Sequence, residues 1–112
     1  MRRSEDFRRT VRHGVRAGRR TVVVHALLLE VDRSDGPDQQ IGFVVSRAVG
    51  SAVRRNRVRR RLRHLVRSRL SELPSRTLMV VRALPAAAAA GPELDADLHV
   101  AWDTALSRLA RR

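Results

Sequence analysis

Apolar residues gather along the chain in three short runs that predict β-strands. The first run is TVVVHALLLEV at 21–31, the second is IGFVVS at 41–46 and the third is RTLMVVRAL at 76–84. Runs of this length, rich in β-branched residues and bounded by Gly, Pro and Asp, are typical of strands. We expect the second strand to pair antiparallel with the first, and residues 15–18 are a candidate for a short extra strand.

Three segments with helical spacing flank these strands. Ser4 is placed to cap a helix over about 5–13, whose first turn is acidic. A second helix is expected over about 51–71 and should end before Pro74. The last helix begins near Pro92, and its apolar stripe consists of Leu94, Leu98, Ala101, Trp102, Ala105 and Leu109.

The predicted order is therefore helix, strand, strand, helix, strand, helix, in a chain of 112 residues. A chain of this length forms one compact domain and has no room for a second. Because 43% of its residues are hydrophobic, it has enough apolar surface for a core. We expect a single α+β domain spanning 1–112, in which helices pack on a sheet as an α/β sandwich.

The charge of the chain is strongly positive. It carries 24 basic residues against 11 acidic ones, a formal net charge of +13, and every basic residue is arginine. Arginine binds phosphate through two N–H groups at once and stacks on bases. A genome rich in G and C explains the missing lysines, but it does not explain why no acidic residue occurs between Asp38 and Glu72. This segregation indicates a nucleic acid as the partner.

The arginines are densest in VRRNRVRRRLRHLVRSR at 53–69, which divides into two faces when wound as a helix. Charged helix faces are usually only solvated. Here, however, no acid is present to pair with the arginines, so neighbouring charges repel. We interpret this face as a polyanion-binding surface. The apolar face consists of Val58, Leu62, Leu65 and Val66, and the opposite face of Asn56, Arg59, Arg60, Arg63 and Arg67.

Asn56 interrupts the arginines but lies within their arc. Its amide can donate and accept, so it can read a base edge, a 2′-hydroxyl or a backbone carbonyl where arginine can only donate. A local cap of the helix is the alternative role for this side chain.

The stretch GFVVSRAVGSAVRRNRVRRRLRHLVR at 42–67 closely resembles the signature of the bacterial ribonuclease P protein component. That family is marked by an Arg-Asn-Arg core followed by further basic residues on one helix. The segments SEDFRRTVRHG and RTLMVVRALP also match its layout, so the resemblance covers nearly the whole chain. The matching residues are Arg55, Asn56 and Arg57, followed by Arg59, Arg60 and Arg63.

The resemblance implies a fold of the ribosomal protein S5 domain 2-like type, with a left-handed crossover through the basic helix. It also implies the protein subunit of a ribonucleoprotein that removes the 5′ leader of precursor tRNA. In this family catalysis belongs to a large RNA subunit that uses Mg²⁺, so we expect no catalytic residue, cofactor or metal ligand in this chain. A ribosomal protein or a general RNA chaperone is the alternative function.

Two sets of site residues follow from the resemblance. The RNA subunit is expected to contact the Arg-Asn-Arg helix, and the leader is expected in a cleft between the sheet and the first helix. The chain departs from the family at Val11 and His25, where aromatic residues are frequent, and at Ala48, where a second basic residue is common. The helix contacts that the resemblance implies are Arg55, Asn56, Arg57, Arg59, Arg60 and Arg63, and Arg67 is added because it lies on the polar face of the same helix. The leader contacts are Phe7, Val11, His25, Phe43 and Arg47.

On sequence grounds, Phe7, Phe43 and His25 could equally well be core residues. Aromatics make up only 3% of the chain, and stacking of a base on an aromatic side chain contributes about 1–3 kcal/mol. We therefore expect the leader cleft to depend more on charge than on stacking.

Other classes of function lack the residues that they need. There is no cysteine, and the four histidines show no HExxH motif or i, i+4 pair for zinc. The acids form no convergent set for a nuclease acting alone. The longest apolar stretch, 22–29, is too short to span a bilayer, and the N-terminus lacks the apolar run of a signal peptide. We expect a cytoplasmic protein whose partners are the RNA subunit and precursor tRNA, with no membrane or DNA partner.

Overall fold

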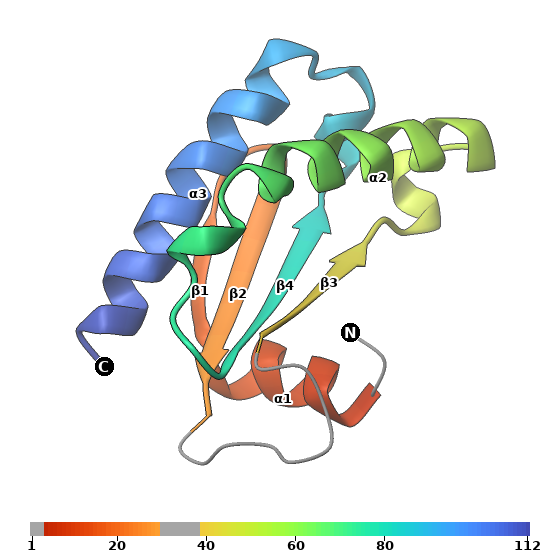
Figure 1. Cartoon of the computed structure of the whole chain (residues 1–112). Coiled ribbons are helices and arrows are strands. Elements are labelled where there is room, and N and C mark those ends of the chain that lie inside the picture. The colour runs from red at the N-terminus through yellow and green to blue at the C-terminus, as the bar shows by residue number, and fades with distance from the viewer. Residues whose placement is uncertain (1–3, 30–38) are drawn as a thin grey trace.

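The computed structural model describes residues 4–29 and 39–112, which form a four-stranded sheet flanked by helices (Figure 1). The predicted end of the first strand at Glu30 and Val31 lies outside the described residues. The order of elements agrees with the prediction, and the candidate extra strand is present as β1. The elements are α1 (Ser4–His13), β1 (Val15–Gly18), β2 (Val22–Leu28), β3 (Gln40–Val44), the 3-10 turn η1 (Arg47–Val49), α2 (Ala52–Arg67), η2 (Leu70–Glu72), β4 (Thr77–Ala83), η3 (Pro85–Ala89) and α3 (Pro92–Ala110).

The basic helix α2 is shorter than predicted. It begins after Ser51, whose Oγ accepts a hydrogen bond from the Arg54 N–H at 3.3 Å, and it ends at Arg67. Ser68 is the C-cap residue and donates its hydroxyl to the Leu65 carbonyl at 3.1 Å, after which the chain turns into η2. The predicted extension to residue 71 is wrong because this turn directs Arg69 away from the α2 axis and toward α3.

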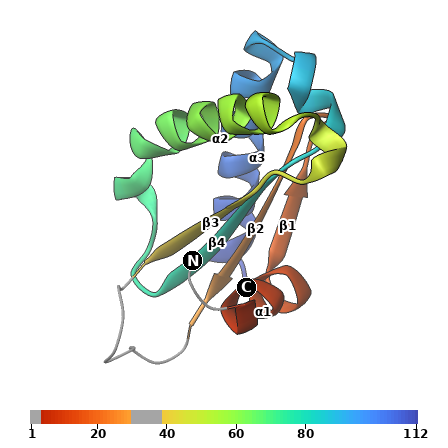
Figure 2. The same ribbon diagram turned by 90° about the vertical axis from the view of Figure 1, so that its right-hand side faces the viewer.

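The strand order is β1-β2-β4-β3, with β2 antiparallel to β1 and to β4. The expectation that the first two predicted strands pair is wrong, because β3 is an edge strand that runs parallel to β4. Residues 77–81 of β4 are buried throughout, as a strand in the middle of a covered sheet requires. Seen from the side of α2 with β3 and β4 pointing up, β4 lies to the left of β3, so the crossover through α2 is left-handed (Figures 1 and 2).

Helices cover both faces of the sheet. Helices α2 and α3 lie on one face, and α1 lies on the other, where it packs against β2 and β4 (Figure 2). Gly14 allows α1 to close onto the sheet, because a Cβ at this position would come within 2.4 Å of the Ala26 carbonyl oxygen and 2.5 Å of the Thr10 oxygen. A side chain of any size would therefore push the helix away from β2.

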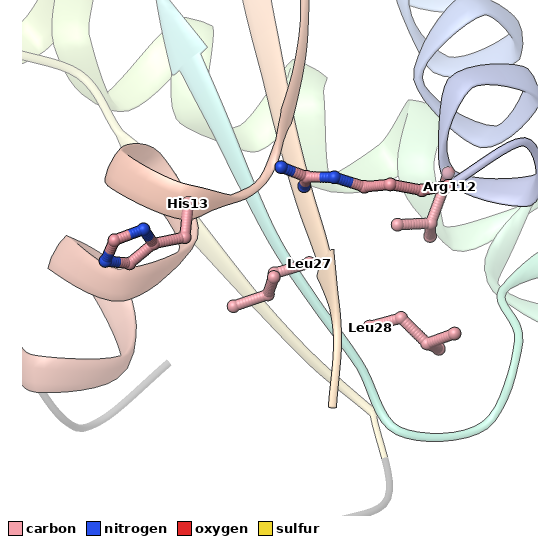
Figure 3. A pocket seen from close by; sticks show the side chains of 5 residues that line it. His13, Leu27, Leu28 and Arg112 are labelled. Atoms are coloured by element: carbon pink, nitrogen blue, oxygen red, sulfur yellow. The ribbon is translucent and has the colours of Figure 1, made fainter. Parts of the chain in front are cut away.

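A pocket of about 340 Å³ lies where α1, β2 and α3 end together. Figure 3 shows Leu27 and Leu28 at its centre, with His13 of α1 on one side and Arg112 at the chain's end on the other. The pocket is mainly apolar, and none of the predicted site residues lines it.

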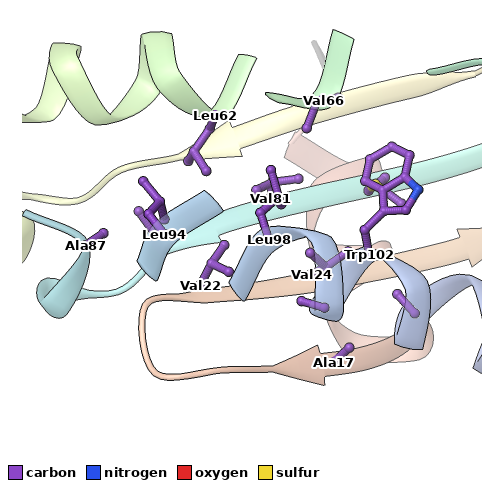
Figure 4. Packing of buried hydrophobic residues seen from close by; sticks show 14 of the residues in the cluster. Ala17, Val22, Val24, Leu62, Val66, Val81, Ala87, Leu94, Leu98 and Trp102 are labelled. Carbon is purple, nitrogen blue, oxygen red and sulfur yellow. The ribbon is translucent and has the colours of Figure 1, made fainter. Parts of the chain in front are cut away.

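The hydrophobic core lies between the sheet and the layer formed by α2 and α3 (Figure 4). Trp102 of α3 is fully buried there, and the predicted apolar stripe of α3 is buried along its whole length. The stripe of α2 is confirmed too, since Val58, Leu62 and Val66 are buried and Leu65 packs against the cluster. Burial of this stripe fixes which side of α2 faces solvent.

Candidate nucleic-acid interface

The exposed side of α2 carries the arginines that were predicted to bind a polyanion. We call this set the arginine face; it consists of Arg55, Asn56, Arg57, Arg59, Arg60, Arg63 and Arg67. Arg55 and Arg59 are half-buried, and the other members of the arginine face are exposed. Within residues 4–29 and 39–112, no arginine of this face forms an ion pair with a carboxylate.

Asn56 belongs to the arginine face but does not cap the helix, because Ser51 does so. Its Oδ1 instead accepts a hydrogen bond from Nη1 of Arg59 at 2.9 Å. The two residues are three apart, a spacing that brings side chains together on a helix surface. Asn56 thus holds one guanidinium of the face in place, a role that the sequence analysis missed.

The acids on α3 and η2 are bound by other arginines. Arg61 pairs with Asp95 at 2.6 Å, and the hydrogen bond from this carboxylate raises the pKa of Arg61 above its ordinary value. Arg20 donates its Nε to Glu93 at 2.7 Å. These pairs lie away from the arginine face, so they leave its charge uncompensated.

Asp97 of α3 is buried and ties the helix to the turn between β1 and β2. The N–H and hydroxyl of Thr21 donate to its Oδ2 at 3.1 Å and 2.7 Å. Burial alone would raise the pKa of Asp97, but the hydrogen bonds from Thr21 and the charge of Arg19 lower it overall. Asp97 is therefore a structural anion and is not available to an RNA-binding or metal site.

Arg69 joins the end of α2 to α3. It pairs with Glu72 at 2.8 Å and with Asp103, and its guanidinium carbon lies 5.5 Å from the Trp102 ring centroid. Its Nη1 also donates to the His99 carbonyl at 3.3 Å. The hydrogen bond to Glu72 is the largest of the contacts that raise the pKa of Arg69. Although it lies in the same run of arginines, this residue serves the fold.

The predicted leader contacts divide between the two faces of the sheet. Phe7 and Val11 lie half-buried on α1, next to the buried Asp6 and Thr10. His25 alternates along β2 with core residues, so its side chain points to the α1 side. The structure therefore brings these three residues to the same side of the molecule.

His25 is 3% exposed, and neither of its ring nitrogens has a hydrogen-bond partner in the described part of the chain. Its neighbours across the sheet on this side are Arg16 of β1, directly opposite, and Arg82 of β4. Burial lowers the pKa of His25, and the charges of Arg82 and Arg16 lower it further. Burial and the two exposed arginines therefore all disfavour protonation of the imidazole.

Phe43 and Arg47 do not lie with His25 on the α1 side of the sheet. Phe43 pairs in register with Val81, which belongs to the core cluster, and its ring lies 5.8 Å from the guanidinium carbon of Arg63. It therefore faces α2, across the sheet from His25. Arg47 is exposed in η1, between β3 and α2.

Comparisons with known proteins agree with this arrangement of fold and charge. The family model described as ribonuclease P matches residues 1–106. The ribonuclease P protein component of Acidothermus cellulolyticus is 50% identical over 111 residues, which cover 99% of this chain and 88% of the relative. That of Streptomyces bikiniensis is 52% identical over 113 residues and covers 97% and 89%. The chain belongs to the ribonuclease P protein family.

Solved structures of ribonuclease P proteins share the fold. The protein from Staphylococcus aureus superposes with a TM-score of 0.78 at 22% identity, covering 94% of this chain and 93% of that one. The protein from Thermotoga maritima gives 0.70 at 22% identity, with 100% and 96% covered. The predicted fold class is thus confirmed. The family match and the relatives of about 50% identity confirm the role as a ribonuclease P protein subunit, in preference to a ribosomal protein or an RNA chaperone.

Two features of this ribonuclease P protein were not found from its sequence. Arg16 and Arg82 flank His25 only because β1 and β4 lie on either side of β2. The sequence pattern does not identify which strands are neighbours in the sheet. The ion pairs of Arg61 and Arg69 with acids of α3 likewise depend on contacts between residues distant in sequence.

The described residues show neither a cluster of metal-binding side chains nor a membrane-spanning helix. Among residues 4–29 and 39–112, no group of three or more His, Cys, Asp or Glu side chains is placed to hold a metal ion. In the same part of the chain, no helix is both long and apolar enough to cross a membrane.

Proposed function

We propose that the arginine face of α2 binds the catalytic RNA subunit of ribonuclease P. The observation that carries the proposal is the division of arginines on and beside α2. Arg61 and Arg69 have carboxylate partners, whereas the arginine face has none in the described residues. Like charges at helical spacing destabilise an isolated helix, so a partner that supplies phosphates favours this arrangement.

The salt dependence of the RNA affinity should follow from the number of phosphates that the arginine face contacts. If the arginine face neutralises about four phosphates, the logarithm of the affinity should fall against the logarithm of salt concentration with a slope of roughly −3 to −4. The arginine face positions a folded RNA through the phosphate backbone of the RNA, because each guanidinium group can bind two phosphate oxygens at once.

The opposite side of the sheet is proposed to hold the 5′ leader of precursor tRNA. Phe7, Val11 and His25 lie on this side, and Arg16 and Arg82 add positive charge beside the histidine. Phe43 is left out of this proposal because it faces α2, and Arg47 is kept only as an exposed cation between the two surfaces. Charge is the main source of affinity here, since only one aromatic residue takes part.

Mg²⁺ is proposed to act through the RNA subunit and not through a site of this chain. Its chemistry would be to neutralise charge at the scissile phosphate and activate the attacking water. The residues described here support a role in binding and positioning RNA. The cytoplasmic location and the precursor tRNA substrate belong to the same proposal.

Reconstitution tests the proposal. Precursor tRNA with Mg²⁺ is incubated with the purified chain, with a catalytic RNA of this family, or with both. Cleavage is expected only when the RNA is present, and adding the chain should increase the affinity for precursor tRNA over tRNA without a leader. Cleavage by the chain alone would show that the catalytic centre has been assigned to the wrong subunit.

Paired variants then test the arginine face itself. Replacing Arg57 and Arg60 together by Gln should weaken assembly with the catalytic RNA by at least about tenfold, because two phosphate contacts are lost. Replacing Arg111 and Arg112 by Gln removes the same charge at the C-terminus and is the matched control. Equal losses in the two double variants would contradict the proposal, since only net charge would then matter.

A further inference from the structure

A second pocket, of about 420 Å³, lies beside the arginine face. Its walls come from the edge strand β3, from the C-terminal half of α2 and from η2. This volume is within the range of small-ligand sites in proteins. The pocket is on the α2 side of the sheet, so it is separate from the proposed leader surface around His25.

The side chains of the pocket suit an aromatic, electron-rich ligand. Phe43 provides a half-buried ring, and the guanidinium carbon of Arg63 lies 5.8 Å from its centroid. Leu70 adds an apolar wall that is 41% exposed, and Arg67 adds a second cation. Guanidinium planes and aromatic rings are the groups on which proteins stack unpaired bases. Among the described residues, no acidic side chain lines the pocket.

Gln39 gives the pocket a hydrogen-bonding group of fixed orientation. Its Nε2 donates to the Leu73 carbonyl at 2.6 Å and to the Pro74 carbonyl at 3.3 Å. Because both partners are acceptors, the amide nitrogen must point toward them, and Oε1 is left without a partner in the described residues. The pocket therefore presents one acceptor suited to an amino or imino N–H.

We propose that this pocket takes an unpaired base of the RNA subunit. The base stacks on the ring of Phe43, Arg63 moves outward to cover the base's other face, and Gln39 accepts a hydrogen bond from a base N–H. Arg67 then lies at the adjoining phosphate. The inference rests on the proposed function, because the strand must first lie on the arginine face.

Charge and position favour RNA over a peptide as the occupant. Arg63 and Arg67 belong both to the pocket and to the arginine face, so a strand whose phosphates lie along α2 passes the pocket entrance. A peptide would meet two cations, and the described part of the lining has no carboxylate to bind the peptide's basic groups. The RNA subunit is preferred to precursor tRNA because the proposed leader surface is on the other side of the sheet.

Two labelled probes with equal charge separate base binding from phosphate binding. One is hexa-adenylate RNA, and the other is a strand of the same length whose riboses carry no bases. The full-length chain should bind the adenylate about tenfold more tightly, as one stacked base predicts. Phe43→Leu should abolish this preference while the salt dependence of binding stays the same, because an aromatic ring is lost and no charge is removed.

A second variant supplies a direct signal that does not depend on Phe43→Leu being folded. In Phe43→Trp the indole takes the place of the ring, and its fluorescence should be quenched by hexa-adenylate and not by the abasic strand. Trp102 is fully buried and gives a constant background. Equal quenching by both probes, or none, would overturn the proposed stacking.

The outcomes distinguish failure of the pocket from failure of the arginine face. Equal affinity of the wild-type chain for both probes, with a steep salt dependence, would overturn the pocket and leave the arginine face standing. A preference that persists in Phe43→Leu would place the base site elsewhere and would also overturn it. A salt-independent response to both probes would instead contradict the proposed function.

Experiments on the reconstituted holoenzyme show whether the RNA subunit or precursor tRNA supplies the base in the pocket. Phe43→Leu should weaken assembly with the catalytic RNA by about tenfold. Once assembled at saturating protein, the variant enzyme should bind precursor tRNA as the wild type does. Normal assembly combined with a loss of precursor affinity would assign the pocket to the substrate and contradict the proposal.

Discussion

Arg59 donates a hydrogen bond from Nη1 to the Oδ1 of Asn56, one turn earlier on α2, at 2.9 Å. An arginine at position 56 could not accept this bond and would repel its neighbour. Asparagine interrupts the run of arginines because the face needs an acceptor that carries no charge. Its exposed amide N–H₂ group takes no part in this bond, so under the proposed function it can donate to the RNA.

Asn56→Ala should weaken binding of the catalytic RNA by about three- to tenfold, the cost of one exposed hydrogen bond and a less ordered Arg59. The salt dependence of the affinity should not change, because no charge is lost. Titrations at several salt concentrations measure both quantities. A shallower slope in this variant would contradict the role assigned to Asn56.

Arg60 and Arg61 are adjacent in sequence but differ in what they bind. Arg60 lies on the arginine face, whereas Arg61 pairs with Asp95. Arg60→Ala should make the salt dependence of RNA binding shallower by about one, as expected for one phosphate contact. Arg61→Ala lowers the net charge equally but should leave that slope unchanged. If both variants shift the slope alike, the assignment of faces is wrong.

The sequence predicted the elements that local patterns determine. The stripe Val58, Leu62 and Val66 could be located because a helix repeats every 3.6 residues, and the structure buries it. Strand order could not be predicted in this way. Whether β3 lies next to β2 or β4 depends on contacts between residues distant in sequence, and adjacent pairing was only the simplest choice.

The candidate site shows the same limit. Helical spacing placed Arg60 on the polar face and left Arg61 outside it, but the ion pairs of Arg61 with Asp95 and of Arg69 with Asp103 depend on the position of α3. Phe43 was assigned to the wrong side of the sheet for a related reason. The run IGFVVS is apolar on both faces of the strand, so its pattern does not mark which face meets α1 and which meets α2.

Arg69→Ala should lower the free energy of unfolding by about 2–3 kcal/mol, since hydrogen bonds to charged groups contribute about 1.5–3 kcal/mol. The substitution removes the contacts to Glu72 and Asp103 and the packing on Trp102. Arg67→Ala, on the exposed face, should change stability by no more than about 0.5 kcal/mol. Urea unfolding of the three proteins measures the difference, and equal stability of the two variants would contradict this role of Arg69.

His25 should make stability depend on pH in mildly acidic solution. Its pKa is lowered from the ordinary 6.5 by burial and by Arg82 and Arg16, so the unfolded chain binds this proton more tightly than the folded one. Stability should therefore be highest above the ordinary pKa and fall as the pH drops below it. His25→Leu should flatten this part of the curve, and at neutral pH it should stabilise the fold by about 1 kcal/mol, because the unpartnered ring nitrogens are removed. Thermal unfolding between about pH 5 and 7.5 measures the effect, with His13→Leu on the exposed end of α1 as the matched control. If His25→Leu keeps the wild-type curve, the buried imidazole is not its source.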